Sequence, residues 1–320
     1  MASEMLQLQL RSISYEASSI VSFELRSANG AELPPFSAGA HIDVQLPGGR
    51  IRSYSLVNAQ SERWRYVIAV NNDAKSRGGS RHMHEALRVG ASLTVSAPRN
   101  NFPLVEDAAA TVLLAGGVGI TPVLCMIERL SALGRRWTLY YCARTRQHAA
   151  FLDRLNQLRG STGCEVHLNF DHGSPSNMLD IGAVVAASPA EAHLYCCGPV
   201  PMLTAFELAC AALAPERVHV EYFAAKELPA AEGGFEVELA RSGKVVPVPR
   251  GMTVLDALLE AGVNAPYSCM EGVCATCETA VISGIPDHKD LMLTKEEKAA
   301  NNIMMICCSG SKSARLVLDL

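Results

Sequence analysis

Four cysteines near the C-terminus constrain the fold of this chain more than any other feature. Cys269, Cys274 and Cys277 have the spacing C-x4-C-x2-C, and Cys307 follows after a longer interval. This is the spacing of a plant-type [2Fe–2S] site, in which thiolates hold two irons. Gly272 lies inside the loop, where the backbone must pass close to the sulfides and a positive φ is accessible. A structural zinc site usually shows two closely spaced pairs of cysteines, so a triplet plus one favours the iron–sulfur interpretation.

The other cysteines give no sign of a disulfide framework. The chain is long, and its first residues, Met1-Ala-Ser-Glu-Met, contain neither a basic region nor an apolar run of the kind a secretory signal has. We therefore expect a cytoplasmic location. The spacing favours Cys307 as the fourth ligand, with the adjacent Cys308 as a small buried side chain. Four further cysteines are expected to be inert: Cys125, Cys142, Cys164 and Cys210.

Composition and charge limit the classes of protein that need consideration. The chain has 320 residues, enough for two or three domains, a net charge of −4 and a hydrophobic fraction of 49%. Nothing in this balance points to nucleic acid. Residues 108–127 carry no charge and have the length of a membrane span. Because Gly116, Gly117, Gly119 and Pro122 interrupt them, a strand, a glycine turn and a helix explain the segment better, and no membrane association is expected.

Residues 1–103 show short alternating segments broken by Gly and Pro. The strand-like segments are 6–10, 20–25, 41–46, 66–70 and 92–95. Many short strands at close spacing predict a small antiparallel β-barrel.

From residue 110 the pattern becomes one of apolar strands alternating with helices. Residues 111–115 form a continuous apolar run, followed by a glycine turn and a predicted helix over 122–133. Further strands are predicted at 137–142, 166–170 and 193–197. This alternation predicts an α/β doubly wound domain with a parallel sheet over residues 104–225.

A third domain is predicted after a linker at 226–234. It begins with a strand pair, 235–239 and 244–248, and continues with a helix over 253–261. Thr253 suits the N-cap of this helix and Gly262 its C-terminal stop. The cysteine loop and a closing strand at 314–318 complete the domain, which spans 235–320.

Two glycine turns suggest a nucleotide site. Gly116, Gly117 and Gly119 lie between a strand and a helix, where backbone can approach a pyrophosphate at the helix N-terminus, and Pro122 suits the first helical turn. Taken alone, such a turn is equally explained as a tight turn without a ligand. A second strand end delivers Cys197, Gly198 and Pro199 to the same edge of the sheet, which strengthens the nucleotide interpretation.

A flavin site is suggested in the barrel. The run Arg52-Ser-Tyr-Ser-Leu follows a predicted strand and offers a guanidinium, an aromatic face and two hydroxyls. The run Ser76-Arg-Gly-Gly-Ser opens a predicted helix over 81–87, which adds a second phosphate anchor. By itself, an ordinary exposed strand explains Arg52 and Tyr54 better, but the later motifs reverse that preference.

Taken together, these motifs resemble those of the phthalate dioxygenase reductase family, with the vanillate demethylase reductases close by. The resemblance runs from Leu6 to Leu320 and includes the order of the domains. The motifs that carry it are Arg52-Ser-Tyr-Ser-Leu, Ser76-Arg-Gly-Gly-Ser, Gly116-Gly-Val-Gly-Ile-Thr-Pro, Cys196-Cys-Gly-Pro and the four cysteines. Lesser matches are Pro98-Arg-Asn-Asn-Phe-Pro, Gly284-Ile-Pro-Asp-His-Lys-Asp and Leu316-Val-Leu-Asp-Leu.

The resemblance implies a multi-domain fold with a flavin barrel, a nicotinamide domain and a C-terminal β-grasp ferredoxin. It also implies FMN rather than FAD, with Arg52 holding the phosphate, Tyr54 packing on the ring and Ser55 near N5. Further residues implied at the flavin are Ser53, Gly78, Gly79, Ser80 and Phe223.

For the nicotinamide cofactor, the resemblance implies NADH. Gly116, Gly117, Gly119, Thr121 and Pro122 would serve the dinucleotide phosphates, and Cys197, Gly198 and Pro199 would lie near the nicotinamide. Ser55 and Cys197 are thus the candidate catalytic residues. Arg144 follows the second strand of this domain, but the family has an Arg nearby, so it does not indicate NADPH.

The activity implied is electron transfer from NADH to FMN, then to [2Fe–2S], then to a separate Rieske-type oxygenase. The partner would dock near Met270, Glu271, Gly272 and Val273, and a monomer is expected because all cofactors share one chain. Two alternatives stay open: a reductase for another acceptor such as a heme monooxygenase, and a non-enzymatic redox sensor. Two departures from the family are Ala275, where Gly is usual, and Met270, where a polar residue is usual. Only a local shift is expected from Ala275.

Overall fold

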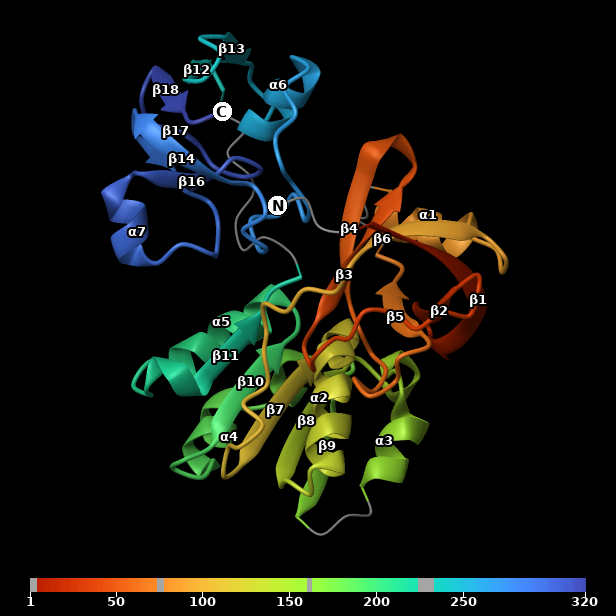
Figure 1. Cartoon of the computed structure of the whole chain (residues 1–320). Coiled ribbons are helices and arrows are strands. Elements are labelled where there is room, and N and C mark those ends of the chain that lie inside the picture. The colour runs from red at the N-terminus through yellow and green to blue at the C-terminus, as the bar shows by residue number, and fades with distance from the viewer. Residues whose placement is uncertain (1–4, 74–77, 160–162, 224–232) are drawn as a thin grey trace. The chain divides into compact units, whose positions relative to one another are not determined.

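The computed structural model describes residues 5–73, 78–159, 163–223 and 233–320. The chain forms two compact units, Met1–Glu221 and Tyr222–Leu320 (Figure 1). Each unit has its own hydrophobic core, and the two are described separately below.

The first part of the N-terminal unit is an antiparallel barrel. Its strand order is β4-β3-β6-β1-β2-β5, and a bridge between Leu56, just after β4, and Ile68 of β5 links the two outermost strands. This confirms the predicted antiparallel barrel. The strands are β1 (Met5–Ala17), β2 (Ile20–Ser27), β3 (His41–Leu46), β4 (Arg50–Ser55), β5 (Tyr66–Asn71) and β6 (Ser92–Ser96), and helix α1 (Gly79–Glu85) follows β5.

Two local details of the barrel differ from the sequence prediction. The run that begins at Arg52 follows strand β3, as predicted, but its first four residues are themselves part of strand β4, because Arg52 pairs with Val44 and Tyr54 with Ile42 of β3. Helix α1 begins at Gly79, two residues before the predicted start. The left-handed backbone of Gly78, with φ at 92°, marks the boundary.

The second part of this unit is a parallel α/β sheet, as predicted. The order β11-β10-β7-β8-β9 reverses direction between β7 and β10, which makes that point the topological switch of the sheet. Its strands are β7 (Thr111–Gly116), β8 (Trp137–Ala143), β9 (Cys164–Phe170), β10 (His193–Cys197) and β11 (Val218–Glu221). Its helices are α2 (Ile120–Ala132), α3 (Leu152–Leu158), α4 (Ile181–Ala187) and α5 (Val200–Ala209).

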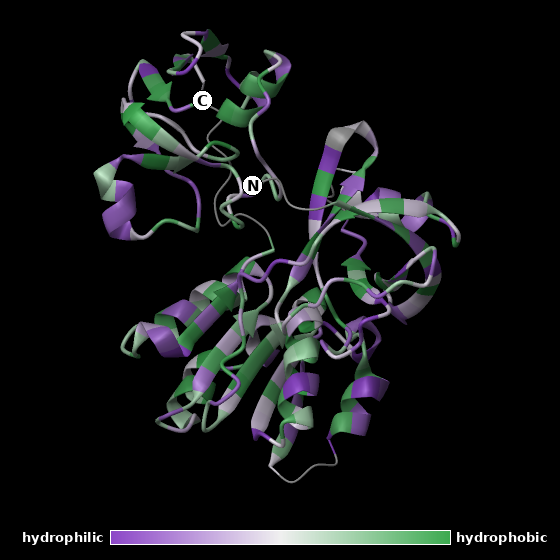
Figure 2. Cartoon of the chain, in the orientation of Figure 1, coloured by the Kyte–Doolittle hydropathy of each residue, from purple (hydrophilic) through white to green (hydrophobic). Residues whose placement is uncertain are grey.

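One hydrophobic cluster joins the barrel to the α/β sheet, while the interior of the barrel forms a cluster of its own. Helix α2 is buried on most of its surface, and its residues pack in one cluster with Val57, Phe102 and Trp137. Figure 2 shows that β7, the central strand of the sheet, is hydrophobic along most of its length. Because burial of apolar surface dominates folding free energy, the cluster that joins them explains why these two parts form one unit.

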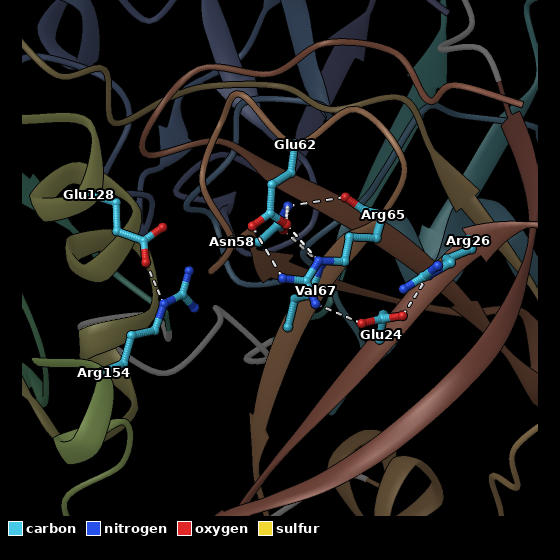
Figure 3. Close-up of polar contacts among 8 residues, drawn as sticks. All are labelled: Glu24, Arg26, Asn58, Glu62, Arg65, Val67, Glu128 and Arg154. Atoms are coloured by element: carbon cyan, nitrogen blue, oxygen red, sulfur yellow. Dashed lines mark hydrogen bonds and ion pairs between the residues drawn. The ribbon is translucent and has the colours of Figure 1, made fainter. Parts of the chain in front are cut away.

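A polar network orders the loop between β4 and β5 of the barrel (Figure 3). Arg65 lies between two carboxylates, with Nη1 2.7 Å from Glu24 Oε2 and Nε 2.6 Å from Glu62 Oε2. On the facing helices, Glu128 of α2 pairs with Arg154 of α3. Burial raises the pKa of Glu128, and the charges of Glu62 and Arg65 also act on it. The network therefore couples the loop electrostatically to the helices beside it.

The C-terminal unit is a mixed sheet of the β-grasp type, confirming the prediction. Its order is β13-β12-β18-β14-β16, with β12 and β18 parallel and the other pairs antiparallel. The strands are β12 (Phe235–Leu239), β13 (Val245–Val248), β14 (Glu278–Ser283), β16 (Ile303–Met305) and β18 (Arg315–Leu318), with a small pair β15 (Pro286–Asp287) and β17 (Gly310–Ser311). The helices are α6 (Val254–Glu260) and α7 (Lys295–Ala300).

The predicted limits of helix α6 agree with its structure. Thr253 is the N-cap and forms a capping box with Asp256, and Gly262 adopts a φ of 74° just past the end. The predicted domain limits at 103, 225 and 234 stay predictions, and residues 226–232 of the predicted linker lie outside the described residues. Within the described parts of the chain, no helix is long and apolar enough to span a membrane.

Candidate functional site

The two glycine turns meet at the switch point of the parallel sheet. A Cβ on Gly119 would overlap the carbonyl of Cys197, and a Cβ on Gly116 would lie 2.6 Å from Cδ of Pro199. A Cβ on Gly198 would lie 3.2 Å from Cα of Gly116. The backbones therefore touch, and glycine is needed for that approach. This is the edge at which doubly wound sheets bind their ligands.

The other residues of the first turn mainly shape it. Gly117 adopts a left-handed φ of 54°. Thr121 is buried, and its hydroxyl donates to the carbonyl of Val118 over 2.9 Å. Pro122 is buried in the first turn of α2. Contact of Thr121 and Pro122 with a dinucleotide stays a prediction, whereas their part in holding the turn is visible.

Two side chains from other strands lie beside Cys197. Glu221 ends β11 opposite Cys197 of β10, and the Cys197 thiol lies 3.9 Å from Glu221 Oε2. Ser55, at the end of β4, hydrogen-bonds the same carboxyl group. The structure thus brings together the two predicted catalytic residues, Ser55 and Cys197, around a carboxyl group that the sequence prediction missed.

The Glu221 carboxyl and the Cys197 thiol are both protonated at neutral pH. Burial raises the pKa of Glu221 from 4.5 to about 8, against the opposing effect of hydrogen bonds from Cys197 and Ser55. Burial, and then the nearby Glu221, raise the pKa of Cys197 well above its ordinary value. A thiol so far from ionisation is no nucleophile. Ser55, Cys197 and Glu221 together can instead orient a bound ring and hold a proton beside it.

A second set of residues surrounds the start of helix α1 in the barrel. A Cβ on Gly79 would lie 2.9 Å from Nε of Arg52, and one on Gly78 would overlap the guanidinium of Arg50. The Ser80 Oγ is buried and has no hydrogen-bond partner among the described residues. Two guanidinium groups, a helix N-terminus and an orphaned hydroxyl fit an anionic group such as a phosphate. Arg50 was missed because it lies outside the Arg52-Ser-Tyr-Ser run.

The remaining predicted flavin residues have different surroundings. The Ser53 hydroxyl donates to Oδ1 of Asp43 over 2.7 Å, so it links β4 to the neighbouring strand β3. Tyr54 is half-buried, and burial raises its phenol pKa to about 12. Phe223 belongs to the second unit, where 41% of its surface is exposed. Contact of these three side chains with a flavin stays a prediction.

The four predicted cluster ligands lie together in the C-terminal unit. The thiol of Cys269 interacts with those of Cys274 and Cys307, and the thiol of Cys277 interacts with that of Cys307. Within the described residues, no group of three His, Cys, Asp or Glu side chains is arranged around a single ion. A two-iron cluster shares its four thiolates between two metals, so a single-ion arrangement is not required.

The cysteine loop contains three residues with a left-handed backbone conformation. Met270, Gly272 and Ala275 have φ angles of 56°, 70° and 57°. The N–H of Glu271 donates to Sγ of Cys269 over 3.4 Å. An amide that points at a ligand sulfur is the surrounding expected for a cluster thiolate. The Cys308 side chain is fully buried, as predicted.

Ala275 has a left-handed backbone conformation, which glycine accepts far more readily than alanine. The expectation of only a local shift at this position stays a prediction. Two of the cysteines expected to be inert have raised pKa values. Burial raises the pKa of Cys125 to about 12 and that of Cys142 to about 11, so both thiols are unreactive.

Two protein-family models match parts of this chain. A 2Fe-2S iron-sulfur cluster binding domain matches residues 237–311, which include all four cysteines. An oxidoreductase NAD-binding domain matches residues 113–207, which include both glycine turns.

Relatives match the chain along nearly its whole length. A phenoxybenzoate dioxygenase subunit beta from Ectopseudomonas oleovorans is 55% identical, over 98% of this chain and 97% of the relative. A vanillate O-demethylase oxidoreductase from Pseudomonas sp. is 44% identical, over 99% of this chain and 100% of the relative. A phthalate dioxygenase reductase from Burkholderia cepacia is 41% identical, over 98% of this chain and 97% of the relative.

Solved structures give the same result for the fold. A structure of phthalate dioxygenase reductase, described as modular for electron transfer from pyridine nucleotides to [2Fe-2S], matches with a TM-score of 0.81 and 41% identity. It covers 99% of this chain and 98% of that one. A type IV self-sufficient cytochrome P450 monooxygenase matches with a TM-score of 0.79 and 40% identity, over 99% of this chain and 41% of that one.

Proposed function

The chain belongs to the phthalate dioxygenase reductase family, and we propose that it is the reductase component of a Rieske-type aromatic-ring dioxygenase or demethylase system. It is an oxidoreductase with an NAD-binding domain and a [2Fe–2S] domain. The observation that carries the proposal is the match at 41–55% identity along nearly the full length of relatives named as parts of oxygenase and demethylase systems. The proposed route is NADH to FMN, to [2Fe–2S], to the oxygenase.

FMN is the flavin that the barrel is proposed to hold. Arg52, Gly79 and Ser80 would bind its phosphate, with Arg50 as an additional cation, and the orphaned hydroxyl of Ser80 supports this assignment. Tyr54 and Ser55 would border the ring. The chemistry that FMN supplies when bound is the conversion of a two-electron donor into single electrons.

NADH is proposed to bind at the switch point of the parallel sheet. The backbone amides of the first glycine turn would bind its phosphates, while Cys197, Gly198 and Pro199 would border the nicotinamide. Ser55, Cys197 and Glu221 would orient the nicotinamide, and Glu221 would hold a proton there because its pKa is raised to about 8.

The oxygenase is proposed to dock beside the cysteine loop. Met270, Glu271 and Val273 keep part of their surfaces exposed around the cluster ligands. A partner that collects single electrons needs such access to the loop. The monomeric state and the cytoplasmic location stay predictions.

The proposal is tested by analysis of the flavin and of the electron acceptor. Acid release of the flavin from the purified holoprotein, followed by chromatography against FMN and FAD, should give FMN. With NADH, the holoprotein should then reduce a purified Rieske oxygenase under anaerobic conditions, followed as bleaching of the Rieske absorbance. Release of FAD, or an oxygenase that stays oxidised, would contradict the corresponding part of the proposal.

A second candidate acceptor is a heme monooxygenase. The observation that favours it is the match of the whole chain to 41% of a self-sufficient cytochrome P450 monooxygenase. A competition experiment distinguishes the two acceptors. The NADH-reduced protein is mixed with a ferric P450 and a Rieske oxygenase at equal concentration. Reduction of the Rieske centre at a rate at least tenfold higher supports the first candidate, and the reverse order supports the second.

A further inference from the structure

One sequence motif has no part in the proposed electron route. The run Gly284-Ile-Pro-Asp-His-Lys-Asp contains two ionisable side chains, His288 and Asp290, that the C-terminal unit buries. Only 8% of the His288 side chain and none of the Asp290 side chain is exposed. Charged side chains are rarely buried without a specific partner, because desolvation of the charge is costly.

Asp290 is held by a set of donors from the turn that follows it. Its Oδ2 accepts from the N–H of Leu293 at 2.9 Å and from that of Met292 at 3.2 Å. The ammonium of Lys298, on helix α7, lies 3.7 Å from the same oxygen. His288 Nδ1 lies 3.7 Å from Oδ1, which accepts no hydrogen bond among the described residues. These contacts fix the conformation of residues 288–293.

The same turn contacts both segments that carry the cluster cysteines, the loop around Gly272 and the segment around Ser309. The N–H of Leu291 donates to the carbonyl of Gly272 over 3.0 Å. A Cβ on Gly272 would lie 3.1 Å from Cα of Asp290 and 2.5 Å from Sγ of Cys308, so the loop is pressed against the turn. The N–H of Lys289 donates to Oγ of Ser309, two residues after the fourth cluster ligand. The turn therefore braces both segments that carry the cysteines.

We propose that Asp290 is a positioning residue of the [2Fe–2S] site. It fixes the turn that holds Gly272 and Ser309 in place, and it adds a buried negative charge behind the cysteine loop. Lys298 holds this carboxylate from the outside of the domain. Outer partners of this kind commonly orient metal ligands and tune the metal. The inference rests on the [2Fe–2S] assignment and is independent of the identity of the oxygenase.

The test compares Asp290→Asn with Asp287→Asn in the holoprotein. Asp287 lies in the same motif but is partly exposed and pairs with the surface residues Lys289 and Lys312. Asp290→Asn should release iron to a chelator about tenfold faster than the wild-type protein, as loss of an outer partner does at other metal sites. Its cluster midpoint potential should shift upward, because a reduced and more negative cluster no longer faces a buried negative charge. Asp287→Asn should match the wild-type protein in both readouts.

A second pair of variants serves if Asp290→Asn does not fold. Lys298→Met removes the cation that holds Asp290, and Lys295→Met removes an exposed cation one turn earlier on the same helix. Faster iron release in Lys298→Met alone supports the proposal. The proposal is overturned if the two variants of each pair release iron at the same rate and the cluster midpoint potential of a folded Asp290→Asn variant is unchanged. NADH oxidation with ferricyanide, measured alongside, reports the flavin site separately and so distinguishes this outcome from a failure of the proposed function.

Discussion

At the scale of single residues, the buried carboxyl of Glu221 gives the clearest pH-dependent expectation. Its pKa is raised to about 8 in the folded protein, whereas an exposed Glu has a pKa of 4.5. The unfolded chain therefore releases this proton at lower pH than the folded one. The associated stability is fully present below pH 4.5 and is lost as the pH rises towards 8.

The variant Glu221→Gln tests this expectation, because it keeps the shape of the side chain and cannot ionise. We predict that its thermal unfolding midpoint equals that of the wild-type holoprotein near pH 5 and exceeds it above pH 8 by several degrees. Glu16 and Glu128 also have raised pKa values, but both are present in the two proteins, so the difference isolates Glu221. A constant difference across this pH range would show that Glu221 ionises normally.

Ala275 carries backbone strain that a glycine would remove. A non-glycine residue in the left-handed region costs about 1–2 kcal/mol, and glycine loses about 0.5–1 kcal/mol of that gain through its greater freedom in the unfolded chain. We therefore predict that Ala275→Gly stabilises the C-terminal unit by about 0.5–1 kcal/mol in denaturant unfolding.

Gly272→Ala is the matched control for Ala275→Gly. Its new Cβ would meet Sγ of Cys308 at 2.5 Å, so it should lower both stability and iron content. A destabilised Ala275→Gly variant would show that the methyl group of Ala275 makes contacts worth more than the strain.

Most site residues at this scale could be predicted because they stand in compact runs. The four cysteines and the two glycine turns each need a spacing that few other structures share. Glu221 and Arg50 could not be predicted so readily, because each works through a contact with residues distant in sequence. Glu221 reaches Cys197 only when β11 pairs with β10, and Arg50 reaches Gly78 only when β4 lies beside helix α1. The signal available for Glu221 was an acidic residue at the carboxyl end of a strand beside the switch point.

At the scale of elements, helix α6 is the best-defined test of local stability. Its capping box joins Thr253 to Asp256, with the Thr253 Oγ1 accepting from the Asp256 N–H over 3.1 Å. Removal of an N-cap hydroxyl typically costs about 1 kcal/mol. We predict that Thr253→Ala lowers the free energy of unfolding of the C-terminal unit by about this amount, in denaturant titrations of the holoprotein. NADH oxidation with ferricyanide should be unchanged, and a change in that activity would contradict the assignment of α6 to the cluster domain.

Elements with a single strong period could be predicted to within a residue or two. The strands β10 and β12 have the limits expected, because uninterrupted apolar or alternating runs with clear ends define them. Strand β4 was missed, since the sequence Arg-Ile-Arg-Ser-Tyr-Ser alternates only weakly between apolar and polar residues. Helix α1 was misplaced for a related reason, because two glycines at its start have no helical preference of their own.

At the scale of the whole molecule, the order of barrel, parallel sheet and β-grasp sheet could be predicted from the sequence, whereas the exact domain limits stay predictions. The barrel has an interior cluster of its own, but a second hydrophobic cluster joins it to the parallel sheet, and the two form a single compact unit, Met1–Glu221. The change from the barrel pattern to the α/β pattern can be seen in the sequence. It does not show that residues on both sides of this change pack together in one hydrophobic cluster. The C-terminal unit has a separate core.

The central claim is that electrons leave this protein through the cluster of the C-terminal unit. The most direct test is NADH-driven reduction of cytochrome c by the wild-type holoprotein and by Cys274→Ser, with iron content measured on both. We predict that the variant without its cluster reduces cytochrome c at least about tenfold more slowly than the wild-type protein. Its NADH oxidation with ferricyanide should stay within about twofold, because electron transfer to cytochrome c needs the cluster and reduction of the flavin by NADH does not. Retention of full cytochrome c reduction by a variant shown to contain no iron would contradict the account.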